Sequence, residues 1–256
     1  MSKLIDDYVD YLNKELKANS VYIWGAQGQR TLDLTVEDIK KMESTDPTGK
    51  SSTQIVLNFI GKCITAGKDM TKSRAFDCSG LSMYYLIANS IFLSDMTAED
   101  LRKNCTDVGS KYRQKGDLVF VLNSAGKATH VGSVVDDDYV IESRGKDYGV
   151  VKYKFAERSW NLVGRPNWWE YAVTRELKLT SPYMKGNDVG QLQARLTCLG
   201  YPCGTIDDVF GSKTQSALIK AQKALVKGRY AEGVLDEKTT KALGFMWSVD
   251  NDRNDK

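Results

Sequence analysis

The residues of this 256-residue chain best suited to covalent chemistry are Cys78 and its only histidine, His130. Cys78 lies in Asp77-Cys78-Ser79-Gly80, directly before the apolar run 81–87, whose pattern predicts a helix. The unpaired backbone N–H groups and the positive dipole end of a helix N-terminus stabilise a thiolate, so we expect a pKa below the usual value of about 8.5. A nearby imidazole would lower that pKa further. The pattern predicts a cysteine nucleophile with a histidine base.

A structural role would account for the same residues. Asp77 would then be a helix N-cap and Cys78 a small buried side chain, as most single cysteines are. Five cysteines are an odd number, so a disulfide scaffold is not expected, although Cys198 and Cys203 could pair. A single histidine also makes a zinc site hard to assemble, and we expect no metal and no cofactor.

The strand pattern after His130 supplies a third polar residue. Residues 130–135 and 139–142 read as two strands joined by the turn 136–138. With that turn, residue 132 faces residue 142, so Glu142 lies on the same face as His130, at the diagonal position. A carboxylate there would orient the imidazole and stabilise its charged form. A register slip of one residue would move Glu142 to the other face.

The elements around these residues predict an α+β domain over 1–172. Helices are expected within 5–16, 35–42, 55–63 and 97–105, and antiparallel strands within 118–122, 130–135, 139–142 and 149–153. A linker at 173–180 would lead to a small all-α domain at 181–246. Its three helices are expected near 188–199, 212–225 and 236–243. Residues 247–256 would form a polar tail.

The composition is that of an ordinary globular protein, with 41% hydrophobic and 27% charged residues. No stretch approaches the roughly 20 apolar residues of a membrane span, so no stable membrane insertion is expected. The net charge of +3 lies entirely within residues 174–256 and is too small for a nucleic-acid-binding surface, which would show clustered Lys and Arg on one element. The first eight residues carry acids where a secretion signal would be apolar, so no such signal is expected.

Three motifs together resemble the NlpC-type cell-wall cysteine peptidases, over roughly residues 15–172. They are Asp77-Cys78-Ser79-Gly80-Leu81, Gly116-Asp117-Leu118-Val119-Phe120 and Thr129-His130-Val131-Gly132. The resemblance implies a papain-like fold, with Cys78 as nucleophile, His130 as general base and Glu142 as the third polar residue. It also implies substrate-binding roles near the thiol. The residues in question are Tyr22, Trp24, Asp77 and Ser79, and the N-cap role competes for Asp77.

The C-terminal part resembles a three-helix peptidoglycan-binding domain, through Lys185-Gly186-Asn187-Asp188-Val189, Phe210-Gly211 and Gly233-Val234-Leu235-Asp236. It departs from that pattern at Asp208, which replaces a glycine, and at Ala221, which replaces an aromatic residue. The left-handed backbone that a glycine would favour is tolerated by aspartate better than by most residues.

The two resemblances imply a peptidoglycan hydrolase of the endolysin type, acting as a monomer on bacterial peptidoglycan. The expected reaction cleaves an amide bond of the stem peptide, between D-glutamate and the following diamino acid. Two alternatives stay open: a cell-wall-binding protein without activity, and a Cys/His acyltransferase or amidase of related fold. Without a signal, the enzyme would reach the wall after lysis, through a holin or by a dedicated secretion route.

Overall fold

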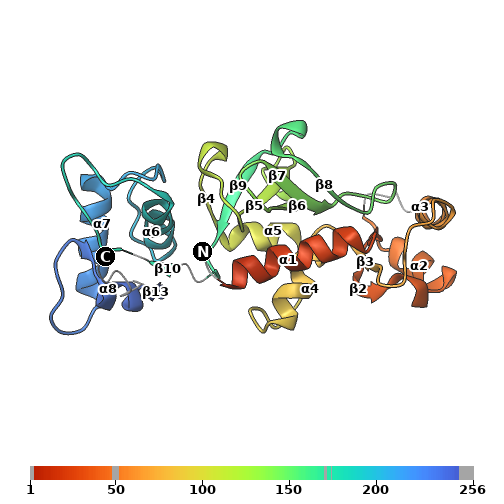
Figure 1. The fold of residues 1–256 in the computed structure, drawn as a ribbon, viewed down its shortest axis with the longest axis horizontal. Helices are drawn as coiled ribbons and strands as arrows, with labels where there is room; N and C mark the ends of the chain where they lie inside the picture. Colours follow the sequence, from red (N-terminus) through yellow and green to blue (C-terminus); the bar gives the residue numbers. More distant parts are fainter. Residues whose placement is uncertain (1–2, 48–51, 170–171, 174, 248–256) are drawn as a thin grey trace, which may run out of the picture. The chain divides into compact units, whose positions relative to one another are not determined.

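The computed structural model describes residues 3–47, 52–169, 172–173 and 175–247, which fall into two compact units (Figure 1). The first, here the N-terminal unit, holds residues 7–103 and 115–163. The second, here the C-terminal unit, holds the described parts of 1–6, 104–114 and 164–256. None of the described helices is both long and apolar enough to cross a membrane.

Five helices belong to the α+β arrangement that the sequence predicts. They are α1 (Lys3–Lys17), α2 (Val36–Glu43), α3 (Thr53–Thr65), α4 (Gly80–Ala88) and α5 (Ala98–Lys103). The start of α2 is a capping box: the Thr35 hydroxyl accepts from the Asp38 N–H, and the Asp38 carboxylate accepts from the Thr35 N–H. Local sequence therefore fixes where this helix begins.

The sheet of the N-terminal unit is an antiparallel meander. It consists of β5 (Leu118–Leu122), β6 (Ala128–Val134), β7 (Tyr139–Ser143) and β8 (Val150–Lys154), paired in that order. The pairs Ser133↔Ile141 and Val134↔Val140 give the register that the turn at 136–138 predicts. In this register position 132 faces position 142.

The helices α1, α4 and α5 lie together below the sheet in the view of Figure 1. A hydroxyl cluster joins two of these helices to the sheet, because the Tyr8 hydroxyl of α1 is 2.7 Å from both Ser82 Oγ of α4 and Ser133 Oγ of β6. The Tyr11 hydroxyl adds a bond of 2.9 Å to the Leu81 carbonyl. These buried bonds fix α4, and therefore the residues at its start, against β6.

A second, three-stranded sheet precedes α4. It pairs β1 (Val21–Tyr22), β3 (Arg74–Phe76) and β2 (Gln27–Arg30) in the order β1-β3-β2. The sequence patterns do not predict β2 or β3, because both are short and one is polar. Their importance is positional: β1 carries Tyr22, and β3 leads directly to Asp77 and Cys78.

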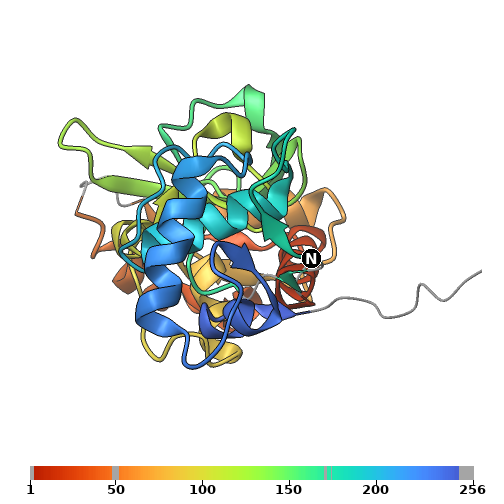
Figure 2. The same cartoon turned by 90° about the vertical axis from the view of Figure 1, so that its left-hand side faces the viewer.

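The C-terminal unit contains the three predicted helices: α6 (Asn187–Cys198), α7 (Ser212–Leu225) and α8 (Glu237–Ala242) (Figure 2). It is not purely helical. Two-residue strands pair β10 (Ala172–Val173) with β13 (Met246–Trp247), and β11 (Leu177–Lys178) with β12 (Val234–Leu235). In addition, β4 (Cys105–Asp107) pairs with the Gly164–Pro166 part of β9 (Leu162–Pro166). The expected linker therefore contains β11, and most of the expected polar tail lies outside the described residues.

Two buried glutamines hold the loops between these helices. The side-chain amide of Gln193 donates to Asp207 and to Thr214 Oγ1, and its Oε1 accepts from the Asp207 and Asp208 N–H groups, over 2.8–3.1 Å. Gln222 repeats this pattern toward the 231–234 loop and Thr239 Oγ1. Asp208, which replaces a glycine, has a left-handed φ of 60°, as its tolerance of that region allows.

Candidate active site

Cys78 occupies the first turn before α4. The Asp77 carbonyl accepts from the Leu81 N–H at 3.3 Å, so the helical bonds begin at Asp77. One oxygen of the Asp77 carboxylate caps this turn by accepting from the Gly80 N–H at 2.6 Å, and the other accepts from the Gly25 N–H at 3.1 Å. A Cβ at position 80 would lie 2.3 Å from the Ala26 carbonyl oxygen, so only glycine fits there. Cys78 is thus held by its backbone at a helix start.

The thiol of Cys78 is buried, with 9% of the residue exposed. Burial raises its pKa to about 12, and the Asp77 carboxylate contributes to the increase. Backbone N–H groups of Val131, Ser79 and Cys78 face the sulfur and oppose this effect. The prediction of a pKa below 8.5 is therefore wrong for the free chain, because the cost of burying a thiolate exceeds the stabilisation from the helix end. Cys78 needs a base to ionise.

His130 and Glu142 are brought together as the strand register predicts. The Nε2 atom of His130 on β6 is hydrogen-bonded to Oε2 of Glu142 on β7, whose side chain is fully buried. The next residue on β6, Val131, directs its N–H toward the Cys78 sulfur. With Nε2 bonded to a carboxylate, Nδ1 is the ring nitrogen that remains to exchange a proton. This arrangement suits a general base oriented by an acid.

Two further residues complete the surroundings of Glu142. Arg158 donates to Glu142 Oε1, and its guanidinium also lies 3.3 Å from the Tyr153 hydroxyl. The same guanidinium lies 4.9 Å from the Trp160 ring centroid, and Trp160 stacks on His130 at 6.3 Å with an interplanar angle of 19°. Neither role is predictable from the sequence, because these residues follow β8 at a spacing that no motif marks.

The four predicted substrate-binding residues differ in their burial and in their contacts. Tyr22 on β1 is buried; burial raises the pKa of its hydroxyl, and the next contributions come from Cys78 and Asp77, so it lies in their electrostatic range. The carboxylate of Asp77 has both oxygens bonded, and Ser79 donates to it at 3.2 Å. Trp24 is half-buried, and its backbone N–H donates to Glu43. Tyr22, Asp77 and Ser79 therefore all lie within electrostatic or hydrogen-bonding range of the thiol.

A buried ionic cluster ties a loop of the sheet to the end of α2. Lys146, in the turn after β7, lies 2.8 Å from Glu43 Oε2 and 3.1 Å from Asp46 Oδ2. The Glu43 side chain is fully buried, and its other oxygen accepts from the Trp24 N–H at 2.8 Å. Glu43 and Asp46 also raise the pKa of Tyr22. This cluster fixes the chain on the Tyr22 side of the thiol.

Glu99 holds the first residue of the strand that carries His130. Its carboxylate accepts from the Ala128 N–H at 2.8 Å and forms two bonds with Arg102, at 2.7 and 2.8 Å. The bonds from Arg102 and from Ala128 lower the pKa of Glu99 to about 2. An acid on α5 therefore anchors β6 two residues before the histidine.

All five cysteines are free thiols, with Cys198 exposed and Cys203 buried. Within the ranges that the structure describes, no group of three or more His, Cys, Asp and Glu residues is arranged to hold a metal ion.

Comparisons with known proteins match two stretches of the chain. The model of the NlpC/P60 family matches residues 66–165, and the model described as "Putative peptidoglycan binding domain" matches residues 185–243. The N-acetylmuramoyl-L-alanine amidase CwlM of Mycobacterium tuberculosis is 40% identical over 63 residues. That similarity spans 25% of this chain and only 15% of the amidase.

Solved structures with similar coordinates are distant in sequence. The peptidoglycan hydrolase RipB of Mycobacterium tuberculosis is 17% identical, with a TM-score of 0.38 over 63% of this chain and 65% of that chain. A P60 domain of Mycobacterium avium subspecies paratuberculosis is 18% identical, with a TM-score of 0.37 over 63% and 96%. NlpC2 of Trichomonas vaginalis is 17% identical, with a TM-score of 0.40 over 64% and 46%. By its family matches, this chain contains an NlpC/P60 domain, which includes Cys78, His130 and Glu142, followed by a peptidoglycan-binding domain.

Proposed function

We propose that the protein is a peptidoglycan hydrolase that cleaves an amide bond of the stem peptide. The observation that carries the proposal is the hydrogen bond between His130 on β6 and the buried Glu142 on β7. The N–H of Val131, the residue after His130, faces the Cys78 sulfur. Cys78, His130 and Glu142 lie within the stretch that matches the NlpC/P60 family, and a peptidoglycan-binding domain follows it. Catalytic residues and polymer binding are thus combined in one chain.

In the proposed reaction, His130 removes the thiol proton as the sulfur attacks the substrate carbonyl. Because the pKa of the thiol is about 12, the thiolate forms only with this transfer, and Glu142 stabilises the resulting imidazolium. Backbone N–H groups at the start of α4 stabilise the oxyanion. His130 then returns the proton to the leaving amine as the C–N bond breaks and a thioester forms. Water, deprotonated by His130, attacks the thioester, which releases a carboxylate and restores the thiol.

For the bond that is cut, we propose the amide between D-glutamate and the diamino acid. The relative CwlM is named for a different reaction, that of an N-acetylmuramoyl-L-alanine amidase. Mass spectrometry of digested cell walls separates the two, because the first cut frees an amine on the diamino acid and the second frees the amine of L-alanine. Digestion by the Cys78→Ala variant is the control, and full activity of that variant would refute the proposed nucleophile.

A cell-wall-binding protein without turnover is the second candidate. The observation that favours it is the buried, protonated Cys78, which reacts slowly unless His130 takes up its proton. Wall pull-down together with amine analysis decides between the two. Binding to walls without release of any amine or peptide, by wild type and Cys78→Ala alike, would establish the second candidate.

The C-terminal domain is proposed to concentrate the enzyme on the wall. Residues 104–114 belong to the same compact unit as residues 164–256, so a truncation near residue 173 would disturb more than wall binding. Comparing kcat/KM of the intact chain on whole walls and on a soluble stem peptide avoids this problem. We expect a clear preference for whole walls.

Access to the wall is proposed to follow lysis, a holin or a secretion route, and fractionation of producing cells tests it.

A further inference from the structure

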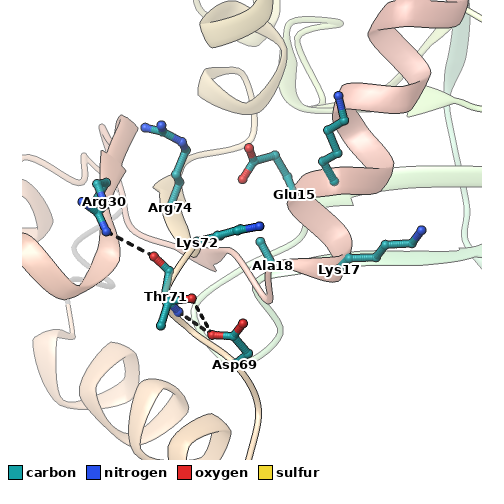
Figure 3. Close-up of a pocket in the computed structure, with 9 residues that line it drawn as sticks. Glu15, Lys17, Ala18, Arg30, Asp69, Thr71, Lys72 and Arg74 are labelled. Atoms are coloured by element: carbon teal, nitrogen blue, oxygen red, sulfur yellow. Dashed lines mark hydrogen bonds between the residues drawn. The ribbon is translucent and has the colours of Figure 1, made fainter.

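The N-terminal unit has a hollow at the end of α1, and none of the residues assigned to catalysis lines it. Its volume is about 710 Å³, and side chains from four segments line it: α1, β2, the 69–72 stretch and β3 (Figure 3). This volume falls in the range of about 300–1,000 Å³ that is typical of ligand sites. Its basic residues are Lys14, Lys17, Arg30, Lys72 and Arg74. Its acidic residues are Glu15 and Asp69.

The positive charge of this hollow does not follow from the overall composition of residues 1–173. Residues 1–173 contain 23 Lys and Arg and 23 Asp and Glu, so this part of the chain has no net formal charge. The lining nevertheless holds five basic and two acidic residues, an excess of three positive charges. Positive charge is therefore gathered at one place in an otherwise balanced region.

The two acids are bonded elsewhere and do not pair with the lysines. Glu15 is buried, with 7% exposed, and accepts from Ser20 Oγ at 2.7 Å. Asp69 accepts from the N–H and the hydroxyl of Thr71, at 2.9 and 2.6 Å. Over the described residues, the ammonium groups of the three lysines form neither an ion pair within 4 Å nor a hydrogen bond. These lysines are Lys14, Lys17 and Lys72.

The two arginines are held in place but keep donors for a ligand. Arg30 donates to the Thr71 carbonyl at 3.2 Å, and its Nε also forms an exposed ion pair of 3.9 Å with Asp33, outside the lining. Arg74 donates to the Gly28 carbonyl at 2.6 Å and lies 4.9 Å from the Tyr84 ring centroid. A guanidinium has five N–H donors, so each group retains several. A fixed, planar fork of donors suits a phosphate group, which it can bind through two parallel bonds.

We propose that this hollow binds a ligand that carries several phosphate groups. In Figure 3 the α1 side chains lie on one side of the hollow, and Arg30, Thr71 and Arg74 lie on the other. A phosphate presents three acceptor oxygens in different directions and can contact both sides, whereas a carboxylate presents two oxygens in one plane. Five cations in one hollow exceed what a single phosphate needs. The proposal is independent of the hydrolase activity, because no lining residue belongs to the catalytic set.

Calorimetric titration of the full chain with sodium tripolyphosphate, at about 50 mM salt to limit screening, tests the proposal. The pocket variant combines Lys14→Gln, Lys17→Gln and Lys72→Gln. The control variant combines Lys41→Gln, Lys62→Gln and Lys127→Gln, which removes the same charge from exposed sites outside the hollow. We expect the pocket variant to bind at least about 30-fold more weakly than wild type, and the control variant within about threefold. Since all six lysines are exposed, both variants should fold.

Equal weakening in the two variants, or no heat of binding with the wild type, would overturn the proposal. Citrate, a probe with several carboxylates, should bind at least about tenfold more weakly than tripolyphosphate; equal binding would overturn the preference for phosphate. Long-chain polyphosphate distinguishes the source of the phosphate. Tighter binding per phosphate than tripolyphosphate indicates a polymer, and equal binding indicates a small oligophosphate. Activity on cell walls plays no part in either readout.

Discussion

The strongest test of the site's construction is the removal of Arg158. The Glu142 carboxylate is fully buried and is bonded by His130 on one oxygen and by Arg158 on the other. Arg158→Met keeps an apolar side chain of similar length against Trp160 but removes the charge. Glu142 then keeps a single partner, which also has to move a proton during the proposed reaction.

The size of the effect follows from burial. Removing one partner of a buried ion pair costs about 3–5 kcal/mol, because the remaining charge is left without compensation. The Arg158 side chain is 24% exposed, so water can replace part of what is lost. Loss of the contact with Trp160 adds about 0.5–1 kcal/mol. We therefore expect Arg158→Met to lower the free energy of unfolding of the N-terminal unit by about 3 kcal/mol.

Urea unfolding monitored by hydrogen exchange in β6 and β7 isolates this unit from the rest of the chain. Arg144→Met is the matched control, because Arg144 is exposed and its guanidinium lies over two aromatic rings, 4.3 Å from the Tyr148 centroid and 5.4 Å from that of Tyr153. This substitution should cost less than about 1 kcal/mol. Adding Glu142→Gln to Arg158→Met should restore part of the loss, since a neutral amide needs no cation. Equal stability of Arg158→Met and wild type, or a further loss in the double variant, would refute this reasoning.

Three further predictions concern single contacts. Alkylation of Cys78 by iodoacetamide, followed by peptide mass spectrometry, should accelerate about tenfold per pH unit between pH 7 and 10, because the pKa of about 12 keeps the thiol protonated; a plateau near pH 7 would contradict this. The lowered pKa of Glu99 makes its stabilisation complete above its ordinary value of 4.5 and lost as the pH falls through about 2. Glu99→Gln should therefore lose about 1–2 kcal/mol at pH 7 and much less at pH 2 in urea titrations, and an undiminished difference at pH 2 would count against it. Gly28→Ala should destabilise by more than about 1 kcal/mol, since φ is 92° and the new Cβ would lie 2.2 Å from Tyr84; an unchanged melting temperature would show that Tyr84 moves freely.

Much of the fold was predictable because the signals are local. The turn at 136–138 fixes the register of β6 and β7, and with it the meeting of His130 and Glu142. The capping box at Thr35 marks the start of α2, and alternating or continuous apolar runs mark β5 to β8. Each of these features depends on neighbours within a few residues or on one tight turn. The α+β class and the three C-terminal helices follow from the same kind of evidence.

Other features depend on residues far apart in the sequence and were missed. The pKa of Cys78 is governed by how completely the surrounding elements exclude water, which a helix-start motif cannot report. Arg158 reaches Glu142 only because the chain after β8 turns back over the sheet, and Lys146 meets Glu43 across about a hundred residues. The strands β2 and β3 form because β3 pairs with both β1 and β2, although neither β2 nor β3 has a strong pattern of its own.

The two glutamine-centred loops of the C-terminal unit share one element. The helix α7 supplies Thr214 to the bonds around Gln193 and contributes Gln222 to the bonds of the following loop. Neither loop can keep its hydrogen bonds if this helix unfolds. Partially folded states that retain only the Gln193 loop or only the Gln222 loop should therefore not be populated at equilibrium. The C-terminal unit is therefore expected to unfold in a single cooperative step, with α7 as the element on which both loops depend.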